Sequence, residues 1–208
     1  MTDQADDILR DLGVSRETKE RLVLLVSMLK KWNPAINLVS RASLDDAWTR
    51  HILDSAQLHG LTSTATHHWA DLGSGGGCPG LVIAIIAAEL RPTMRLTLVE
   101  SDQRKAEFLR HACRSLGLRP RVDVNRIESV APLGADLVSA RALAPLDTLL
   151  GYAHRHLATG GIALFPKGKN HLGEIENAKR NWRFALEVLP SRTDSAAAIL
   201  QVKDLSHA

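Results

Sequence analysis

Apolar residues recur at helical spacing through the first sixty positions of the chain. A short amphipathic helix is predicted over residues 3–12, followed by Gly13. Ser15 is the expected N-cap of a second helix, because a serine side chain can accept a hydrogen bond from the amides of the first turn. Asn33 and Pro34 are expected to end this helix, since proline lacks the amide hydrogen and disfavours helix in the residue before it. The apolar positions of the second helix are Leu22, Leu25, Val26, Leu29 and Trp32.

A third helix is predicted from Ser43 to Gly60. Ser43 and Asp46 have the spacing of a capping box, with aspartate in the place of glutamate. The polar, threonine-rich residues 61–68 (LTSTATHH) then form the expected internal boundary. We therefore expect residues 1–66 to be an N-terminal helical extension of the chain.

Residues 67–208 show a different pattern, in which short β-type runs alternate with helical stretches. The alternation predicts an α/β domain with a mostly parallel sheet and helices on both faces. No helix separates the last two strands, so these are expected to pair antiparallel at one edge. The predicted strands are 68–73, 95–100, 121–127, 135–140, 162–168, 184–189 and 197–202, and the predicted helices are 79–90, 101–117, 145–158 and 174–182.

The strongest local signal is the run DLGSGGGCPG at residues 71–80, between the first strand and its helix. Glycine suits such a turn because the backbone must bend sharply and approach a ligand closely. Gly75, Gly77 and Gly80 match the GxGxxG pattern of dinucleotide sites, and Glu100 lies twenty residues beyond. A nicotinamide or flavin dinucleotide is therefore one candidate ligand.

The same run also matches the acidic-x-GxGxG pattern of S-adenosylmethionine sites, with Asp71 as the acidic residue and Gly73 as the first glycine. A carboxylate beside the loop favours a sulfonium over a pyrophosphate. Pro79 removes one of the amides that a pyrophosphate would use at the helix N-terminus. We therefore prefer the methyl donor, with Asp71, Gly73 and Gly75 as candidate contacts. Glu100 could accept hydrogen bonds from the ribose hydroxyls of either ligand, or cap the helix that follows it.

Composition and charge narrow the class of protein without deciding it. The chain has 208 residues, 45% of them apolar, and a net charge of +3, which suits one globular domain. Its two cysteines have neither the spacing of metal ligands nor that of a disulfide framework. We therefore expect a reducing compartment, and we expect no metal site. The polar, acidic N-terminus is unlike a signal peptide, and every apolar run is far shorter than the ~18 residues of a membrane span. We expect a cytoplasmic protein that binds no membrane.

Positive charge is concentrated in one segment, residues 104–126, with seven basic and two acidic residues. A basic face of this kind could contact RNA phosphates, and Arg104 and Lys105 are the candidates next to the second strand. The alternative is an ordinary solvated helix face. Aromatic residues make up only 4% of the chain, which argues against recognition by base stacking. The basic residues are Arg104, Lys105, Arg110, Arg114, Arg119, Arg121 and Arg126.

These motifs, in this order, resemble the glucose-inhibited division protein B family of small-subunit ribosomal RNA guanine-N(7) methyltransferases. The resemblance covers nearly the whole chain and does not depend on the glycine run alone. It rests on Trp32-Asn33, Ile36-Asn37-Leu38, Arg50-His51 with Asp54-Ser55, the DLGSGGGCPG run, LVES at 98–101, Arg126-Ile127-Glu128, Ser139-Ala140-Arg141 and Lys167-Gly168.

The resemblance implies a Rossmann-like, seven-stranded class I methyltransferase fold with S-adenosylmethionine as cofactor. It implies methyl transfer to nitrogen 7 of one guanine, guanine 527, of the 16S ribosomal RNA. The partner would be the small subunit or an assembly intermediate, and we expect the enzyme to be a monomer. The cofactor contacts that it implies are Gly73, Cys78, Ile127, Glu128 and Arg141.

Nitrogen 7 of guanine carries a lone pair and no proton, so its methylation needs no general base. The candidates for orienting and stabilising the reactants are Arg141 and Lys167, which follow neighbouring strands, where ligands of parallel sheets gather. Arg141 could hold the carboxylate of the cofactor or a phosphate of the target nucleotide, and Lys167 could contact an RNA phosphate.

The resemblance also places the N-terminal extension over the pocket, with Asn37, Arg50, His51 and Asp54 as candidate RNA contacts. The alternative for His51 and Asp54 is a hydrogen-bonded pair on a helix surface. Two rival functions stay open at this point. One is a methyltransferase of another RNA base or of a small molecule, and the other is a non-catalytic dinucleotide-binding module.

Overall fold

The computed structural model describes residues 9–208 and is built around a seven-stranded sheet with the order β3-β2-β1-β4-β5-β7-β6. The first five strands are parallel, and β7 runs antiparallel to both β5 and β6. The predicted antiparallel pairing of the last two strands is confirmed, with β6 at the edge. The strands are β1 (His68–Leu72), β2 (Arg95–Val99), β3 (Arg121–Asp123), β4 (Ala135–Ser139), β5 (Leu157–Lys167), β6 (Trp182–Pro190) and β7 (Ala198–His207).

Four predicted elements in this part of the chain have wrong boundaries. The strand predicted at 162–168 already begins at Leu157, and the strand predicted at 197–202 continues to His207. The third strand ends at Asp123, and Ile127 instead begins a 3-10 turn, η3 (Ile127–Ser129). The predicted helix 174–182 is α8 (His171–Ala178), because Trp182 already pairs with His207 in the sheet. The other helices agree with prediction within two residues, and they are α5 (Gly80–Leu90), α6 (Gln103–Leu116) and α7 (Leu146–His156).

The first long helix is α2 (Arg16–Ile36), and Ser15 caps it by accepting a hydrogen bond from the Thr18 amide at 3.2 Å. The prediction that Asn33 and Pro34 end this helix was wrong. Pro34 lies inside the last turn, where it removes one helical hydrogen bond but does not stop the chain from continuing to Ile36. The helix ends at Asn37, whose left-handed backbone (φ 49°) lets its amide bond to the Asn33 carbonyl. Most of the predicted helix 3–12 lies outside the described residues. Its described part is helical over residues 9–11.

The predicted third helix is broken into short pieces, so its capping box was also misplaced. The cap is Ser40, whose hydroxyl accepts from the Ser43 amide at 3.2 Å. The pieces are α3 (Arg41–Leu44), the π-helical η1 (Trp48–Leu53), α4 (Asp54–Ala56) and the 3-10 turn η2 (His59–Leu61). A wider π-helical turn changes the direction of the side chains after it, and such turns are frequent at functional sites.

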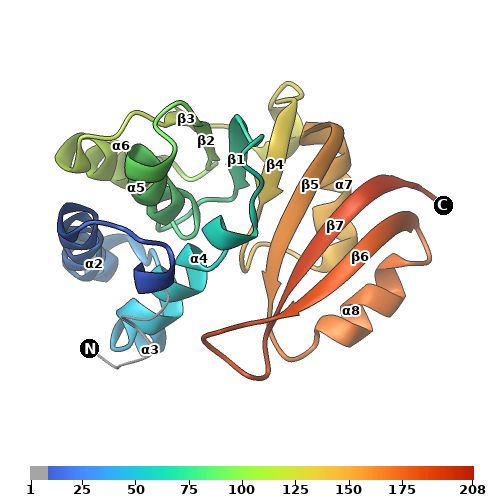
Figure 1. Cartoon of the computed structure of the whole chain (residues 1–208), viewed down its shortest axis with the longest axis horizontal. Coiled ribbons are helices and arrows are strands. Elements are labelled where there is room, and N and C mark those ends of the chain that lie inside the picture. Colours follow the sequence, from blue (N-terminus) through green and yellow to red (C-terminus); the bar gives the residue numbers. More distant parts are fainter. Residues whose placement is uncertain (1–8) are drawn as a thin grey trace.

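Alternate residues of each strand face opposite sides of the sheet, and each side has its own helices. In Figure 1, α5 and α6 lie to the left of the central strands, and α7 and α8 lie to the right. On one face Trp69 packs with Ile83 of α5, and on the other Val138 packs with Leu149 of α7. The helix α5 is buried all round, because the extension covers the side that the sheet does not.

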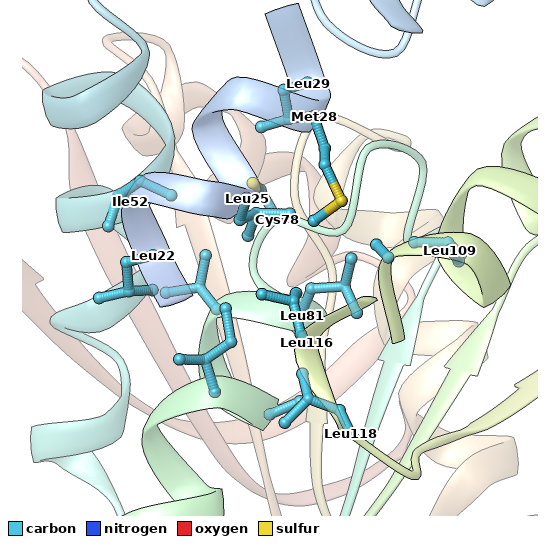
Figure 2. Close-up of a cluster of buried hydrophobic side chains, with 14 of the residues drawn as sticks. Leu22, Leu25, Met28, Leu29, Ile52, Cys78, Leu81, Leu109, Leu116 and Leu118 are labelled. Atoms are coloured by element: carbon cyan, nitrogen blue, oxygen red, sulfur yellow. The ribbon is translucent and has the colours of Figure 1, made fainter. Parts of the chain in front are cut away.

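The N-terminal extension shares a hydrophobic core with the sheet domain. Figure 2 shows the leucines of α2 directed toward the glycine loop and the helices beside it. Leu25 and Leu29 are fully buried in this cluster with Leu81 and Leu109, and Cys78 joins them from the end of the loop. This packing fixes the extension beside the loop. Within residues 9–208 no helix is both long enough and apolar enough to cross a membrane.

Candidate functional site

The glycine run forms a tight loop between β1 and α5. Gly73, Gly75 and Gly77 all have left-handed backbone angles, with φ of +68°, +52° and +84°. A Cβ on Gly73 would lie 2.7 Å from Cδ1 of Leu143, so this position has no room for a side chain. A Cβ on Gly75 would meet nothing closer than a backbone oxygen at 3.8 Å. The backbone of Gly75 therefore faces open space, as an approaching ligand requires.

Asp71 lies beneath this loop and holds it from below. Its Oδ2 accepts a hydrogen bond from the Gly80 amide at 3.1 Å, and its Oδ1 accepts one from the Ser139 hydroxyl at 2.7 Å. The Ser139 hydroxyl in turn accepts from the indole of Trp69 at 2.8 Å. Burial raises the pKa of Asp71 to about 6, although hydrogen bonds from Ser139, Ser74 and Gly80 oppose the shift. The side chain of Asp71 supports the loop through these hydrogen bonds and does not line the cavity described below, so its expected contact with the cofactor stays a prediction.

The fit between Gly80 and Asp71 leads to a stability prediction. A Cβ on Gly80 would lie 2.4 Å from Cδ2 of Leu98 and 2.6 Å from Oδ2 of Asp71. Gly80→Ala is therefore expected to lower the free energy of unfolding by about 1–3 kcal/mol through overpacking. Gly173→Ala is the matched control, because Gly173 lies in α8 with no atom within 4 Å of its added Cβ. The control is expected to stabilise the protein by about 0.5–1 kcal/mol. Urea unfolding of both variants measures this, and equal effects would contradict it.

Glu100, at the end of β2, does line the cavity. Its Oε2 accepts from the Gly75 amide at 2.8 Å and its Oε1 from the Asp102 amide at 2.7 Å. Each oxygen keeps a second lone pair that can accept a ribose hydroxyl. The N-cap of α6 is Asp102, whose side chain accepts hydrogen bonds from the Arg104 and Lys105 amides. The alternative role of Glu100 as the cap of this helix was therefore wrong.

A large cavity of about 1740 Å³ opens above the loop, between the sheet domain and the extension. It lies where the chain leaves the carboxyl ends of β1, β2, β4 and β5, as ligand sites in parallel sheets do. Six predicted cofactor contacts line it besides Arg141, and they are Gly73, Gly75, Cys78, Glu100, Ile127 and Glu128.

The far wall of the cavity combines an apolar surface with a fixed carboxylate. Ile127 is 8% exposed and presents a hydrophobic surface. Beside it, the Tyr152 hydroxyl donates to Oε1 of Glu128 at 2.6 Å, and this hydrogen bond lowers the pKa of Glu128. Cys78 is buried, and burial raises the pKa of its thiol to about 11, so the thiol stays protonated at neutral pH.

Arg141 spans the gap between β4 and the extension. Its Nη1 donates to the Arg50 carbonyl at 2.7 Å and to Oδ2 of Asp54 at 3.1 Å. Its Nη2 donates to Nδ1 of His51 at 2.9 Å. The predicted pairing of His51 with Asp54 on a helix surface is thus replaced by a shared contact with Arg141. The guanidinium joins the two parts of the chain at the edge of the cavity.

The contacts of His51 define its protonation state. An arginine can only donate, so Nδ1 of His51 accepts and its hydrogen lies on Nε2, which donates to the Ser43 hydroxyl at 3.0 Å. Burial and the charge of Arg141 lower the pKa of His51 to about 4. The imidazole is therefore neutral at physiological pH.

This lowered pKa predicts a pH dependence of stability. The unfolded chain binds the His51 proton at the ordinary pKa of 6.5, whereas the folded chain resists it until about 4. Stability from this group is full above the ordinary pKa and is lost as pH falls from 6.5 toward 4. His51→Gln lacks this dependence. We expect the wild type to lose its stability advantage over the variant between pH 7 and pH 5, measured by urea unfolding, and parallel curves would contradict the assignment.

Lys167 lines the cavity but is already engaged. Its ammonium donates to Oε2 of Glu174 at 2.7 Å and to the Ala144 carbonyl at 2.8 Å. The same Glu174 oxygen accepts from the Leu146 amide at 2.7 Å. Lys167 therefore helps to fix the loop that follows β4, and the phosphate contact predicted for it stays a prediction.

The predicted RNA contacts separate into two groups. Asn37, Arg50 and Lys105 line the cavity, while Arg104 lies outside it and pairs with Asp102 at 3.6 Å. The single basic face predicted over residues 104–126 is also divided. Arg110 and Arg114 both pair with Glu107 on α6. Lys105 and Arg126 line the cavity above the glycine loop, whereas Arg119 and Arg121 line a second cavity.

The loop between β6 and β7 lines the cavity through Ser191, Thr193 and Asp194, and the sequence did not predict it as part of the site. The Thr193 hydroxyl donates to Oδ1 of Asp54 at 3.0 Å, so Asp54 holds this loop and Arg141 together. Tyr152 was missed as well. No local motif marks these residues, because they reach the cavity only through the order of the strands.

The comparison with protein families decides between the alternatives. Residues 18–198 match the family model described as rRNA small subunit methyltransferase G. The chain belongs to this family. A family member from Cereibacter sphaeroides, named Ribosomal RNA small subunit methyltransferase G, is 52% identical over 202 residues, which cover 97% of this chain and 98% of that protein. As a family member, the chain is a methyltransferase that uses S-adenosylmethionine.

Solved structures show the same fold at low sequence identity. Cofactor-bound Rv0187 from MTB has a TM-score of 0.61 at 15% identity, covering 88% of this chain and 89% of that one. A mutant of MtNAS in complex with S-adenosylmethionine has a TM-score of 0.57 at 16% identity, covering 89% and 75%. The predicted class I methyltransferase fold is thereby confirmed.

Proposed function

We propose that this family member transfers the methyl group of S-adenosylmethionine to nitrogen 7 of guanine 527 in 16S ribosomal RNA. The observation that carries the proposal is the match to the rRNA small subunit methyltransferase G family over residues 18–198. The cavity supports it, because the glycine loop and the extension form its two walls. We further propose that residues 1–66 act as the cover of the pocket and that the enzyme works as a cytoplasmic monomer.

The residues present fit the cofactor. The backbone at Gly75 is open to the cavity, and Glu100 beside it has free lone pairs for ribose hydroxyls. Ile127 supplies an apolar surface for a purine ring, and Glu128 carries a charge that can attract a cationic group. When bound, S-adenosylmethionine supplies an electrophilic methyl group on a sulfonium. Gly73, Gly75 and Glu100 would hold it in place.

The task of the protein is to orient the acceptor, since nitrogen 7 already carries its lone pair. The groups at the cavity agree with this, because His51 is held neutral between Arg141 and Ser43 and the Cys78 thiol stays protonated. Neither is arranged to take a proton from a substrate. Orientation and electrostatic complementarity therefore carry the rate enhancement.

Arg141 lines the cavity and contacts the N-terminal extension, with its side chain only 15% exposed. We infer that it stabilises negative charge on the reactants. This charge is either the carboxylate of the cofactor or a phosphate of the target nucleotide. Its contacts with Arg50, His51 and Asp54 fix the plane of the guanidinium before the substrate arrives. Such preorganisation avoids a reorganisation cost during the reaction.

Methyl transfer to isolated acceptors tests the proposal. Labelled S-adenosylmethionine is mixed with the protein and with small subunits from a strain that lacks it, with protein-free 16S RNA, or with free guanosine. Transfer to the small subunits is expected. Transfer to guanosine alone would favour a small-molecule methyltransferase instead.

A titration with two ligands tests the rival dinucleotide-binding module. S-adenosylhomocysteine is expected to bind the protein at least tenfold more tightly than NAD. A preference for NAD would overturn the assignment of the loop to the methyl donor.

A further inference from the structure

A second cavity, of about 740 Å³, lies at the opposite ends of β2 and β3 from the cofactor loop. Arginines from three separate places reach it. Arg95 is the first residue of β2, Arg121 is the first residue of β3, and Arg119 lies in the connection between α6 and β3. Arg91, at the end of α5, completes the set. The family function described above does not account for this gathering of positive charge.

Two of these arginines have their charge available. Arg91 is engaged with the Thr62 and Ser63 carbonyls, and Arg121 donates to Oδ2 of Asp123 at 2.6 Å. Arg95 and Arg119, in contrast, are exposed and form no ion pair with a carboxylate within residues 9–208. Asp123 is the one acidic residue among the described residues that line this cavity, so its charge is strongly positive.

The two cavities meet at the edge of the sheet. Asn125 lines both of them, and it follows β3, the outermost strand on this side. The β2 strand between the two cavities is five residues long, or about 17 Å. A ligand that extends from the first cavity around the β3 edge therefore reaches Arg119 and Arg95 within a short distance.

The two cavities differ in the balance of acidic and basic side chains that line them. The first carries slightly more carboxylates than cations, and its Arg141 and Lys167 already have carboxylate partners. Beyond its contact with Arg141, a polyanion therefore gains less net attraction there than at the second cavity. The second cavity has an excess of planar guanidinium groups, which match phosphate oxygens in geometry as well as in charge. Affinity for a phosphate backbone is thus expected mainly at the second cavity.

We propose that the cavity formed around Arg95, Arg119 and Arg121 binds backbone phosphates of the small-subunit RNA, next to the segment that carries the target guanine. The inference rests on the proposed function, which supplies the RNA. The proposal adds a docking site for RNA that lies away from the cavity in which the methyl group would be transferred. Phosphate contacts of this kind position a nucleic acid and provide salt-dependent affinity without reading its bases.

The test compares equilibrium binding of small subunits, prepared from a strain that lacks the protein, to wild-type protein and to Arg95→Gln/Arg119→Gln between 50 and 200 mM salt. Loss of two phosphate contacts is expected to weaken binding about tenfold at low salt and to reduce the slope of log K against log salt by about 1.5. The turnover number at saturating subunits and the Kd for S-adenosylhomocysteine are expected to stay at wild-type values. Arg95→Lys/Arg119→Lys keeps both charges and is expected to keep the slope.

The matched control is Arg110→Gln/Arg114→Gln, which removes the same charge from the outer side of α6. Wild-type affinity and slope for the Arg95 and Arg119 variant would overturn the proposal, and so would an equal loss in the control. If the wild type transfers no methyl group to small subunits, the proposed function fails. The binding comparison still decides whether this cavity holds phosphates.

Discussion

Arg141→Ala is expected to lower the turnover number of methyl transfer to small subunits by about 10²–10³-fold, the loss typical of removing a preorganised charge-stabilising group. The Kd for S-adenosylhomocysteine is expected to rise by less than tenfold, because we propose that Gly75 and Glu100 hold that ligand from the other wall. Arg141 donates to the Arg50 carbonyl, to His51 and to Asp54, so its loss also removes the hydrogen bonds that join the extension to the end of β4. Steady-state kinetics with saturating subunits measures the effect.

Two controls distinguish the role of Arg141 from a general loss of folding. Arg141→Lys keeps the charge but cannot make the forked set of contacts, so it is expected to recover only part of the rate. Arg155→Ala removes another arginine that donates to a carbonyl, that of Val130, away from the cavity lining. This variant is expected to keep the wild-type turnover number. A wild-type rate for Arg141→Ala would remove Arg141 from the site.

Glu100→Ala is expected to weaken binding of S-adenosylhomocysteine by about 10²-fold. Its carboxylate accepts from the Gly75 and Asp102 amides, and hydrogen bonds to a charged group contribute about 1.5–3 kcal/mol each. Removing it frees the loop and also removes the acceptor for the ribose hydroxyls. Isothermal titration calorimetry gives the Kd directly.

The control for Glu100 is Glu107→Ala. Glu107 is an acidic residue of α6 that pairs with Arg114 and does not line the cavity, so its removal is expected to leave the Kd unchanged. A wild-type Kd for Glu100→Ala would mean that the ligand is held elsewhere than at the end of β2.

The sequence pattern was sufficient to predict the fold of the sheet domain, because its strands and helices follow from the local periodicity of apolar residues. Alternation of strands and helices, together with the glycine run at 71–80, gave the parallel sheet and placed the loop after β1. Side-chain periodicity does not depend on distant contacts. The antiparallel pairing of β6 and β7 also followed, since no helix separates them.

The extension and the roles of single residues could not be predicted in the same way. The π-helical turn from Trp48 to Leu53 and the continuation of α2 past Pro34 depend on packing against the sheet domain. Arg141 and Asp54 are 87 residues apart in sequence, and no pattern indicates that they form an ion pair.

Asp71 and Glu100 illustrate how two acidic residues beside one loop can have different tasks. Both were candidates for the cofactor contact, since both end strands next to the glycines. Hydrogen bonds from Gly80 and Ser139 turn Asp71 under the loop, whereas Glu100 holds Gly75 from the cavity side. Only the three-dimensional arrangement distinguishes the carboxylate that supports the loop from the one that lines the cavity.

Identification of the modified nucleoside tests the proposed methyl transfer to guanine 527. Small subunits from a strain that lacks this protein are incubated with it and with S-adenosylmethionine carrying a labelled methyl group. The RNA is then digested in fragments, and the labelled fragment and nucleoside are identified by mass spectrometry. We expect a single labelled 7-methylguanosine, at guanine 527. Label in any other nucleoside, or at another guanine, would contradict it.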